Sequence, residues 1–110
     1  MAYDEELAER IRELSADGPE LTEKKMFGGL GFMLEGNMAV AASSTGGLMV
    51  RIDPDEAAGL TLVDGVELFE MKGRQMNGWV HVEGPELDAD ESLSKWLEIG
   101  LDFAAALPPK

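Results

Sequence analysis

His81 is the side chain best suited to chemistry, because it is the one histidine in a chain without cysteine. It alternates with Trp79 and Glu83, so the three would share one face of a strand. A histidine beside a glutamate can act as a general base. A half-exposed polar face of a sheet gives the same pattern, and we favour that interpretation over an enzyme that uses His81.

Other catalytic and metal-binding patterns are incomplete. Asp53 and Asp55 match the first two ligand positions of a calcium loop, but the required glycine is missing and Asp64 stands in place of the final glutamate. Helix capping explains both residues without a metal. Residues 43–45 offer hydroxyl groups in a turn, but no second histidine is present to build a triad with them. We therefore predict no catalytic, cofactor-binding or metal-binding residue and no cofactor.

The densest glycine cluster lies at residues 26–32. A dinucleotide-binding loop needs a helix after it and a third glycine where Leu34 stands, and here a strand pattern follows instead. The cluster is therefore interpreted as structural, a bend or bulge that needs a positive φ or a close backbone approach. Its residues are Met26, Phe27, Gly28, Gly29 and Gly31.

The chain carries a net charge of −13 over 110 residues, and the acids gather at its two ends. Residues 1–20 are net −5 and residues 83–102 net −6, against −3 for residues 21–82. Nucleic acids are bound mainly through Lys and Arg, so we expect no direct nucleic acid binding. Basic side chains in the middle of the chain suggest an anion-binding rim, with pairing to the many carboxylates as the alternative. The candidate rim consists of Lys25, Arg51, Arg74 and His81.

The first half of the chain predicts a helix followed by a meander. Residues 3–16 repeat apolar positions at helical spacing. Three strands follow within residues 30–52, with a hairpin turn at Gly36-Asn37. Asp53 then caps a short helix that ends near Gly59.

The second half predicts a strand over residues 78–83 and a long final helix. Residues 61–71 stay open between a strand and an irregular segment. Asp88 is expected to cap the long helix, whose apolar stripe consists of Leu93, Trp96, Leu97, Gly100, Leu101 and Ala104. The order of elements indicates an α+β fold in which helices lie on one face of an antiparallel sheet.

The other face of the meander is unusual for a solvated surface. Its residues are small or Met-rich and carry few charges, which is typical of interface centres. This candidate interaction face consists of Met33, Ala39, Ala41, Met49, Arg51, Trp79 and His81. The alternative is that the short middle helix and residues 61–77 cover this face within the chain.

Length and hydropathy indicate one domain of 110 residues with a core over about residues 3–107. No apolar run approaches the ~20 residues that cross a bilayer. The acidic N-terminus lacks a signal-peptide pattern, so we expect a cytoplasmic protein.

Several motifs resemble the N-terminal domain of the TfoX/Sxy competence-regulator family. They are Met26-Phe27-Gly28-Gly29 with Gly31 within residues 25–34, then residues 36–39 and 48–51. Gly78-Trp79 and the last helix add support, so that the resemblance spans about residues 20–107. The strong acidity and Trp79, where the family often has tyrosine, depart from its pattern.

The resemblance implies an α-β(3)-α-β(2)-α domain, similar to secretion-chaperone-like folds, and a non-enzymatic regulatory module. Full-length members continue into a helical C-terminal domain, so we interpret this chain as a stand-alone N-terminal domain and carry over no competence or transcription role. We expect it to act through protein contacts, with a partner or with a second copy in a homodimer, and without a membrane. The alternative is a domain that binds a small anionic ligand at the candidate rim.

Overall fold

The computed structural model describes residues 3–18, 20–26, 28–44, 46–71 and 73–108. The side chains of Met26, Met71, Pro85 and residues 74–77 lie outside this description. In chain order the elements are α1 (Glu5–Leu14), β1 (Thr22–Met26), β2 (Gly29–Leu34), β3 (Asn37–Ala42), β4 (Leu48–Arg51), a 3₁₀ turn η1 (Pro54–Glu56), α2 (Ala57–Leu60), β5 (Val66–Met71), β6 (Arg74–Val82), α3 (Pro85–Asp88) and α4 (Asp90–Ala105).

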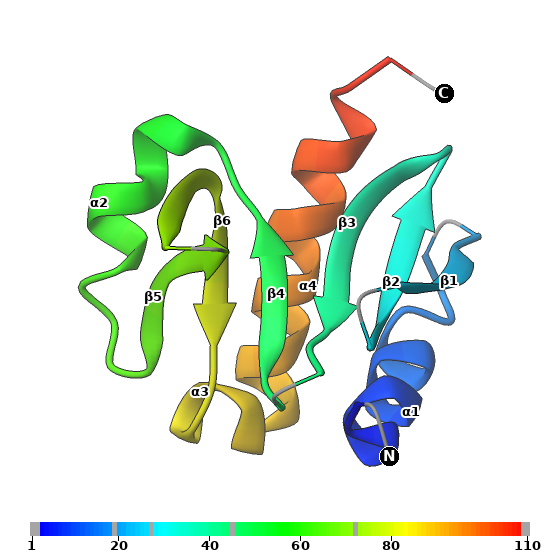
Figure 1. Ribbon diagram of the computed structural model, residues 1–110. Coiled ribbons are helices and arrows are strands. Elements are labelled where there is room, and N and C mark those ends of the chain that lie inside the picture. The colour runs from blue at the N-terminus through cyan, green and yellow to red at the C-terminus, as the bar shows by residue number, and fades with distance from the viewer. Residues whose placement is uncertain (1–2, 19, 27, 45, 72, 109–110) are drawn as a thin grey trace.

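The predicted α+β fold is confirmed. The strands form one antiparallel six-stranded sheet in the order β1-β2-β3-β4-β6-β5 (Figure 1). The sheet has one strand more than the meander predicted, because Thr22–Met26 pairs with β2 as an edge strand. Polar and charged side chains are typical of edge strands, and they hide the alternation that reveals an inner strand. The open segment 61–71 contains β5.

The helices α1 and α4 bury their apolar sides against one face of the sheet. In Figure 1, α4 runs behind β3 and β4. Its predicted stripe is buried at Leu93, Trp96, Leu97, Gly100 and Ala104. Within the described ranges, no helix has the length and apolar character to cross a membrane.

Gly100 sets how closely α4 approaches the sheet. A Cβ atom at this position would lie 2.6 Å from the carbonyl oxygen of Ala39 and 2.8 Å from Cγ1 of Val40. Both contacts are far shorter than van der Waals contact. A residue with no side chain is therefore what lets the helix backbone rest on β3.

Two arginines of α1 form hydrogen bonds and ion pairs with other elements of the domain. Arg10 donates to the carbonyl oxygen of Leu87 at 2.6 Å and to Asp90, at the start of α4. Arg12 forms a two-pronged pair with Glu23 of β1, at 2.7 and 2.8 Å. The hydrogen bonds from Arg12 lower the pKa of the Glu23 carboxyl and raise that of the guanidinium.

One turn and one cap differ from the sequence prediction. The β2–β3 hairpin turns at Glu35 and Gly36, with φ of 51° and 86°, and Asn37 already pairs with Leu34. Both loop residues thus have the positive φ that a tight hairpin turn needs. The expected Asp88 cap is wrong, because Asp88 ends α3 and Ala89 takes the N-cap position of α4 without a side-chain bond.

The glycine cluster makes the β1–β2 turn. Gly28 has a φ of 77°, and a Cβ atom on Gly29 would lie 2.5 Å from the carbonyl oxygen of Ala42. These are the positive φ and the close backbone approach expected for a structural motif. Phe27 lies outside the described residues.

Candidate interaction face

The side of the sheet opposite α1 and α4 is called the outer face. One row of paired residues crosses it over all the strands: Lys24, Gly31, Ala41, Met49, His81 and Glu67. The neighbours of these residues along the strands, such as Leu30, Leu48 and Val82, belong to the core. Because side chains alternate along a strand, the row points away from the helices.

The short middle helix does not cover the centre of this face. Ala57 of α2 belongs to the same core cluster as α1 and α4, and Leu60 packs against that cluster. In Figure 1, no helix passes in front of β2, β3 and β4. In the described part of the chain, the centre of the outer face is therefore left without a helical layer.

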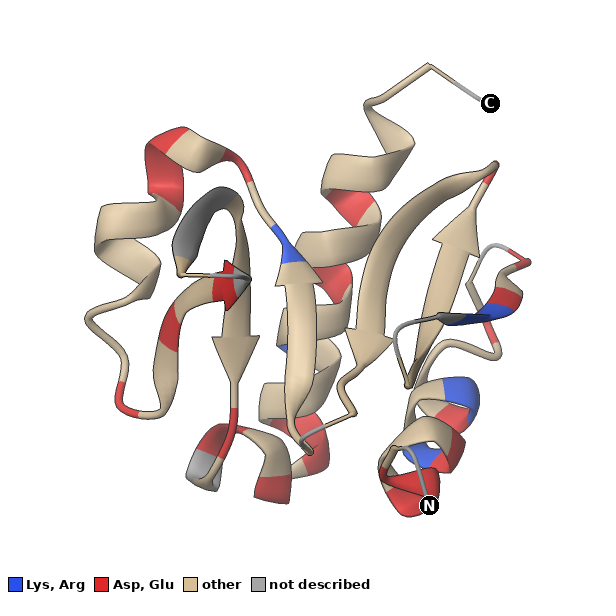
Figure 2. Cartoon of the chain, in the orientation of Figure 1, with Lys and Arg blue, Asp and Glu red and all other residues tan. Residues whose placement is uncertain are grey.

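Charge is scarce at the centre of the outer face and gathers around it. The strands β2 and β3 contain no charged residue. Figure 2 shows the acids on the helices, on the connecting turns and on the edge strand β5, with the central strands largely tan. Met33, Met49, Trp79 and His81 are each half-buried. The surface so formed is largely apolar, with charges at its two ends.

Ala39 was placed on this face by the sequence pattern, and that placement is wrong. The pairing of β2 with β3 shifts between Phe32 and Met33, which leaves Ala39 as the extra residue of a bulge. Ala39 is fully buried against Leu34 and Ala104 on the helical side. Its place on the outer face is taken by Met38, which pairs with Met33 and whose Cε lies 3.1 Å from where a Cβ of Gly31 would stand.

Arg51 borders the face at the end of β4. Its guanidinium carbon lies 5.7 Å from the ring centroid of Trp79 and 5.7 Å from that of Phe103. Both distances fit cation–π contacts. Among the described residues, the ion pairs of the structure do not include Arg51. The contacts hold the guanidinium in place and leave its charge unpaired.

The four residues of the candidate anion rim are not brought together. Lys25 lies on the edge strand β1 and His81 on β6, with β2, β3 and β4 between them. At about 4.8 Å per strand the separation is about 19 Å. The side chain of Arg74 lies outside the description. The four residues of the candidate rim therefore do not form one anion-binding site.

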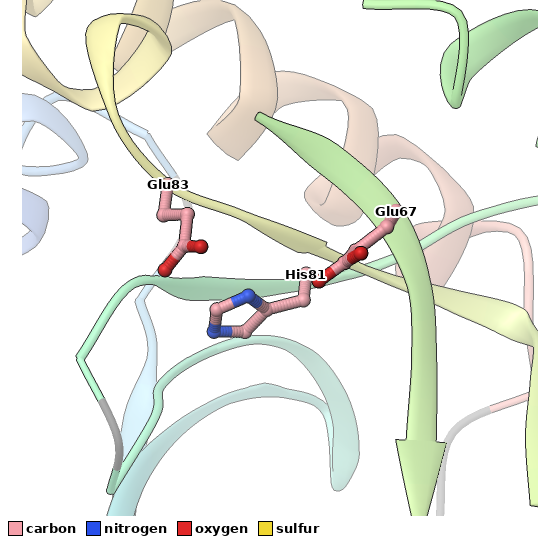
Figure 3. A group of neighbouring side chains, drawn as sticks. All are labelled: Glu67, His81 and Glu83. Atoms are coloured by element: carbon pink, nitrogen blue, oxygen red, sulfur yellow. The ribbon is translucent and has the colours of Figure 1, made fainter. Parts of the chain in front are cut away.

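His81 instead lies close to two carboxylates. Ligand atoms of Glu67, His81 and Glu83 all lie within 4.8 Å of one another (Figure 3). The ring nitrogen Nε2 of His81 lies 3.0 Å from the carbonyl oxygen of Gly46. Glu83 was visible in the sequence as the next residue on the same strand face. Glu67 was missed, because only the pairing of β5 with β6 places it opposite His81.

The comparison with known families fits this architecture. The profile of the TfoX N-terminal domain matches residues 13–104 of the 110-residue chain. The chain belongs to the TfoX N-terminal domain family. None of the curated proteins and none of the solved structures compared with it matches.

Membership in the TfoX N-terminal domain family supports a regulatory domain rather than an enzyme. The match includes all six strands and nearly all of α4. The outer face of this TfoX N-terminal domain, built on those strands, is thus part of the matched region.

Proposed function

We propose that this TfoX N-terminal domain is a small, non-enzymatic regulatory module of the cytoplasm that binds protein through its outer face, with a second copy of the chain as the partner. The observation that carries the proposal is the centre of the outer face, which no helix covers among the described residues. It is apolar, with half-buried methionines around the buried Gly31 and Ala41. Interface centres are enriched in methionine and aromatic residues and depleted of Lys and Glu. A sheet face in contact with solvent would instead carry mostly polar residues at these alternate positions.

The charges at the two ends of the face favour a second copy. The row begins with Lys24 on one edge strand and ends with Glu67 on the other. A two-fold axis parallel to the strands reverses the row between the two copies, which places Lys24 of each chain over Glu67 of the other. A symmetric interface of this kind uses the same patch on both subunits.

The size of the face predicts a weak dimer. The sheet is about 24 Å wide, from about 4.8 Å per strand spacing, and its central strands are about 13–20 Å long. Two such faces bury on the order of 800 Å² in total, below the ~1,200–2,000 Å² of stable specific interfaces and within the range of weak, transient ones. We therefore expect self-association in the micromolar range, so concentrated samples are needed to observe it.

Sedimentation velocity of the wild type and two variants tests the proposal. Met49→Glu puts a carboxylate at the centre of the outer face, whereas Leu62→Glu makes the same kind of change at a side chain that is 84% exposed in the loop after α2. Samples from about 10 to about 500 µM bracket the expected affinity. The wild type and Leu62→Glu should approach the mass of a dimer, while Met49→Glu stays monomeric with an unchanged circular dichroism spectrum.

Two results would overturn the proposal. One is a wild type that remains monomeric over the whole concentration range. The other is a dimer that Met49→Glu leaves intact, because the contact would then lie elsewhere on the surface.

A further inference from the structure

Three side chains with metal-binding atoms converge at one corner of the outer face. Glu67 comes from β5 and His81 from the end of β6, and Glu83 is the first residue after β6. One ligand atom of each lies within 4.8 Å of those of the other two. In Figure 3 the carboxylate of Glu83 lies beside the imidazole, and that of Glu67 extends toward His81 from the neighbouring strand. The cluster lies at the end of the row away from the apolar centre, and it shares Glu67 with the contact that the proposed self-association makes to Lys24 of a second copy.

The backbone holds the three positions in register. Glu67 lies directly opposite His81 in the antiparallel pair, and Glu83 follows two residues later on the same side. The amide of Glu83 donates to the carbonyl oxygen of Gly65 at 2.9 Å, which ties the end of β6 to the start of β5. Only the side-chain torsions of the two glutamates remain to be set by a ligand.

The hydrogen bond of His81 determines which ring nitrogen keeps a lone pair that can bind a metal. The carbonyl oxygen of Gly46 can only accept, so Nε2, at 3.0 Å, carries the proton and donates. The lone pair of the neutral ring is then on Nδ1, the nitrogen that faces Glu83 in Figure 3. Histidines that bind metals almost always donate their other ring N–H in this way, often to a backbone carbonyl.

Gly47 makes room for this arrangement. A Cβ atom there would lie 2.7 Å from Nε2 of His81, and the φ of Gly47 is 82°. Any other residue would push the imidazole away from the Gly46 carbonyl. The loop before β4 therefore supports the ring from the side opposite the carboxylates.

We propose that Glu67, His81 and Glu83 bind a divalent transition-metal cation of the zinc class. Nδ1 and one oxygen from each carboxylate would be the ligands, with the remaining positions open to water. Ligands about 2.1 Å from a tetrahedral ion lie about 3.4 Å apart. Because both glutamates are exposed, rotation of their side chains closes the remaining gap.

The donor set selects the kind of metal. Imidazole suits zinc, copper and nickel, whereas magnesium and calcium prefer sites made of oxygen atoms alone. Among the described residues of one chain, neither Glu67 nor Glu83 takes part in an ion pair. Binding of a dication also relieves the repulsion between the two carboxylates.

Isothermal titration of the full chain with zinc chloride tests the site. We expect one zinc per chain for the wild type. His81→Gln and Glu67→Gln should each weaken binding about 10–100-fold, as removal of a ligand or its support does. Glu98→Gln removes another exposed carboxylate, from α4, and should change the affinity less than about twofold. Magnesium chloride at the same concentrations should give no comparable heat.

The chain's single histidine makes an NMR test unambiguous. In a ¹⁵N-labelled sample, zinc should shift the Nδ1 resonance of His81 and leave Nε2 protonated. Sedimentation of the same samples measures self-association separately from zinc affinity. If Glu98→Gln weakened zinc binding as much as His81→Gln does, the binding would reflect only the attraction of zinc to an acidic surface. That result, or zinc bound through Nε2, would overturn the proposal.

Discussion

Replacement of Gly100 by alanine tests how the final helix rests on the sheet. Alanine favours a helix over glycine by about 1 kcal/mol, which alone would stabilise the protein. The added Cβ atom, however, would lie 2.6 Å from the carbonyl oxygen of Ala39 and 2.8 Å from Cγ1 of Val40. The first of these atoms belongs to the backbone of an inner strand and cannot rotate away.

The clash should outweigh the helical preference. Forcing extra atoms into a packed core costs about 1–3 kcal/mol, and here the helix or strand itself must move, so the upper half of that range applies. We expect Gly100→Ala to lower the free energy of unfolding by about 1–2 kcal/mol after the propensity gain. Urea unfolding followed by tryptophan fluorescence measures this change in the free energy of unfolding.

Gly59 supplies the matched control. It lies in α2, it is exposed, and no atom lies within 4 Å of the position of its missing Cβ. Gly59→Ala should therefore stabilise the domain by about 0.4–1 kcal/mol. If Gly100→Ala stabilised the protein as much as Gly59→Ala, the close approach of α4 to β3 would be refuted.

Three further changes have defined outcomes. Trp96 is buried and its Nε1 donates to Glu86 at 3.0 Å, so Trp96→Ala should cost about 3–5 kcal/mol in urea unfolding; a loss below about 1 kcal/mol would place it on the surface. Glu35→Asn should raise the unfolding midpoint by a few degrees, because a φ of 51° suits asparagine better; calorimetry showing a lower midpoint would refute the tight turn. Glu23 has a lowered pKa beside Arg12, so its stabilisation is present above the usual glutamate pKa and is lost as the pH falls through the lowered value. Glu23→Gln should therefore unfold more easily at neutral pH and equal the wild type in strong acid; an equal deficit at both pH values would contradict the ion pair.

The elements with strong periodicity could be predicted from the sequence. The apolar stripe of α4 and the alternation in β2, β3 and β4 each reflect one buried side, so the pattern records the fold directly. The edge strand β1 was not predicted, because the residues at Thr22–Met26 are largely polar or charged and show no apolar alternation. Its place depends on pairing with β2 and on the contact of Glu23 with Arg12.

The exact residues of the candidate sites could not be predicted, because they depend on how the strands pair, and local sequence patterns do not contain that information. A single bulge at Ala39 reversed the faces assigned along part of β3. The partnership of Glu67 with His81 needs the register between β5 and β6, and residues 61–71 showed no clear period from which to derive it. The outer face could thus be recognised by composition, whereas its exact members required the strand order.

If two copies meet through their outer faces, Lys24 of one chain lies against Glu67 of the other, and a zero-length cross-link tests this contact. Lys24 and Glu67 lie on opposite edge strands of one chain, about 24 Å apart at the usual strand spacing. A carbodiimide joins an amine to a carboxylate only when they touch. In a mixture of ¹⁴N- and ¹⁵N-labelled chains, we expect a Lys24–Glu67 cross-linked peptide that combines both isotopes and disappears in Met49→Glu. Cross-linked dimers that lack this peptide, or that persist in Met49→Glu, would contradict it.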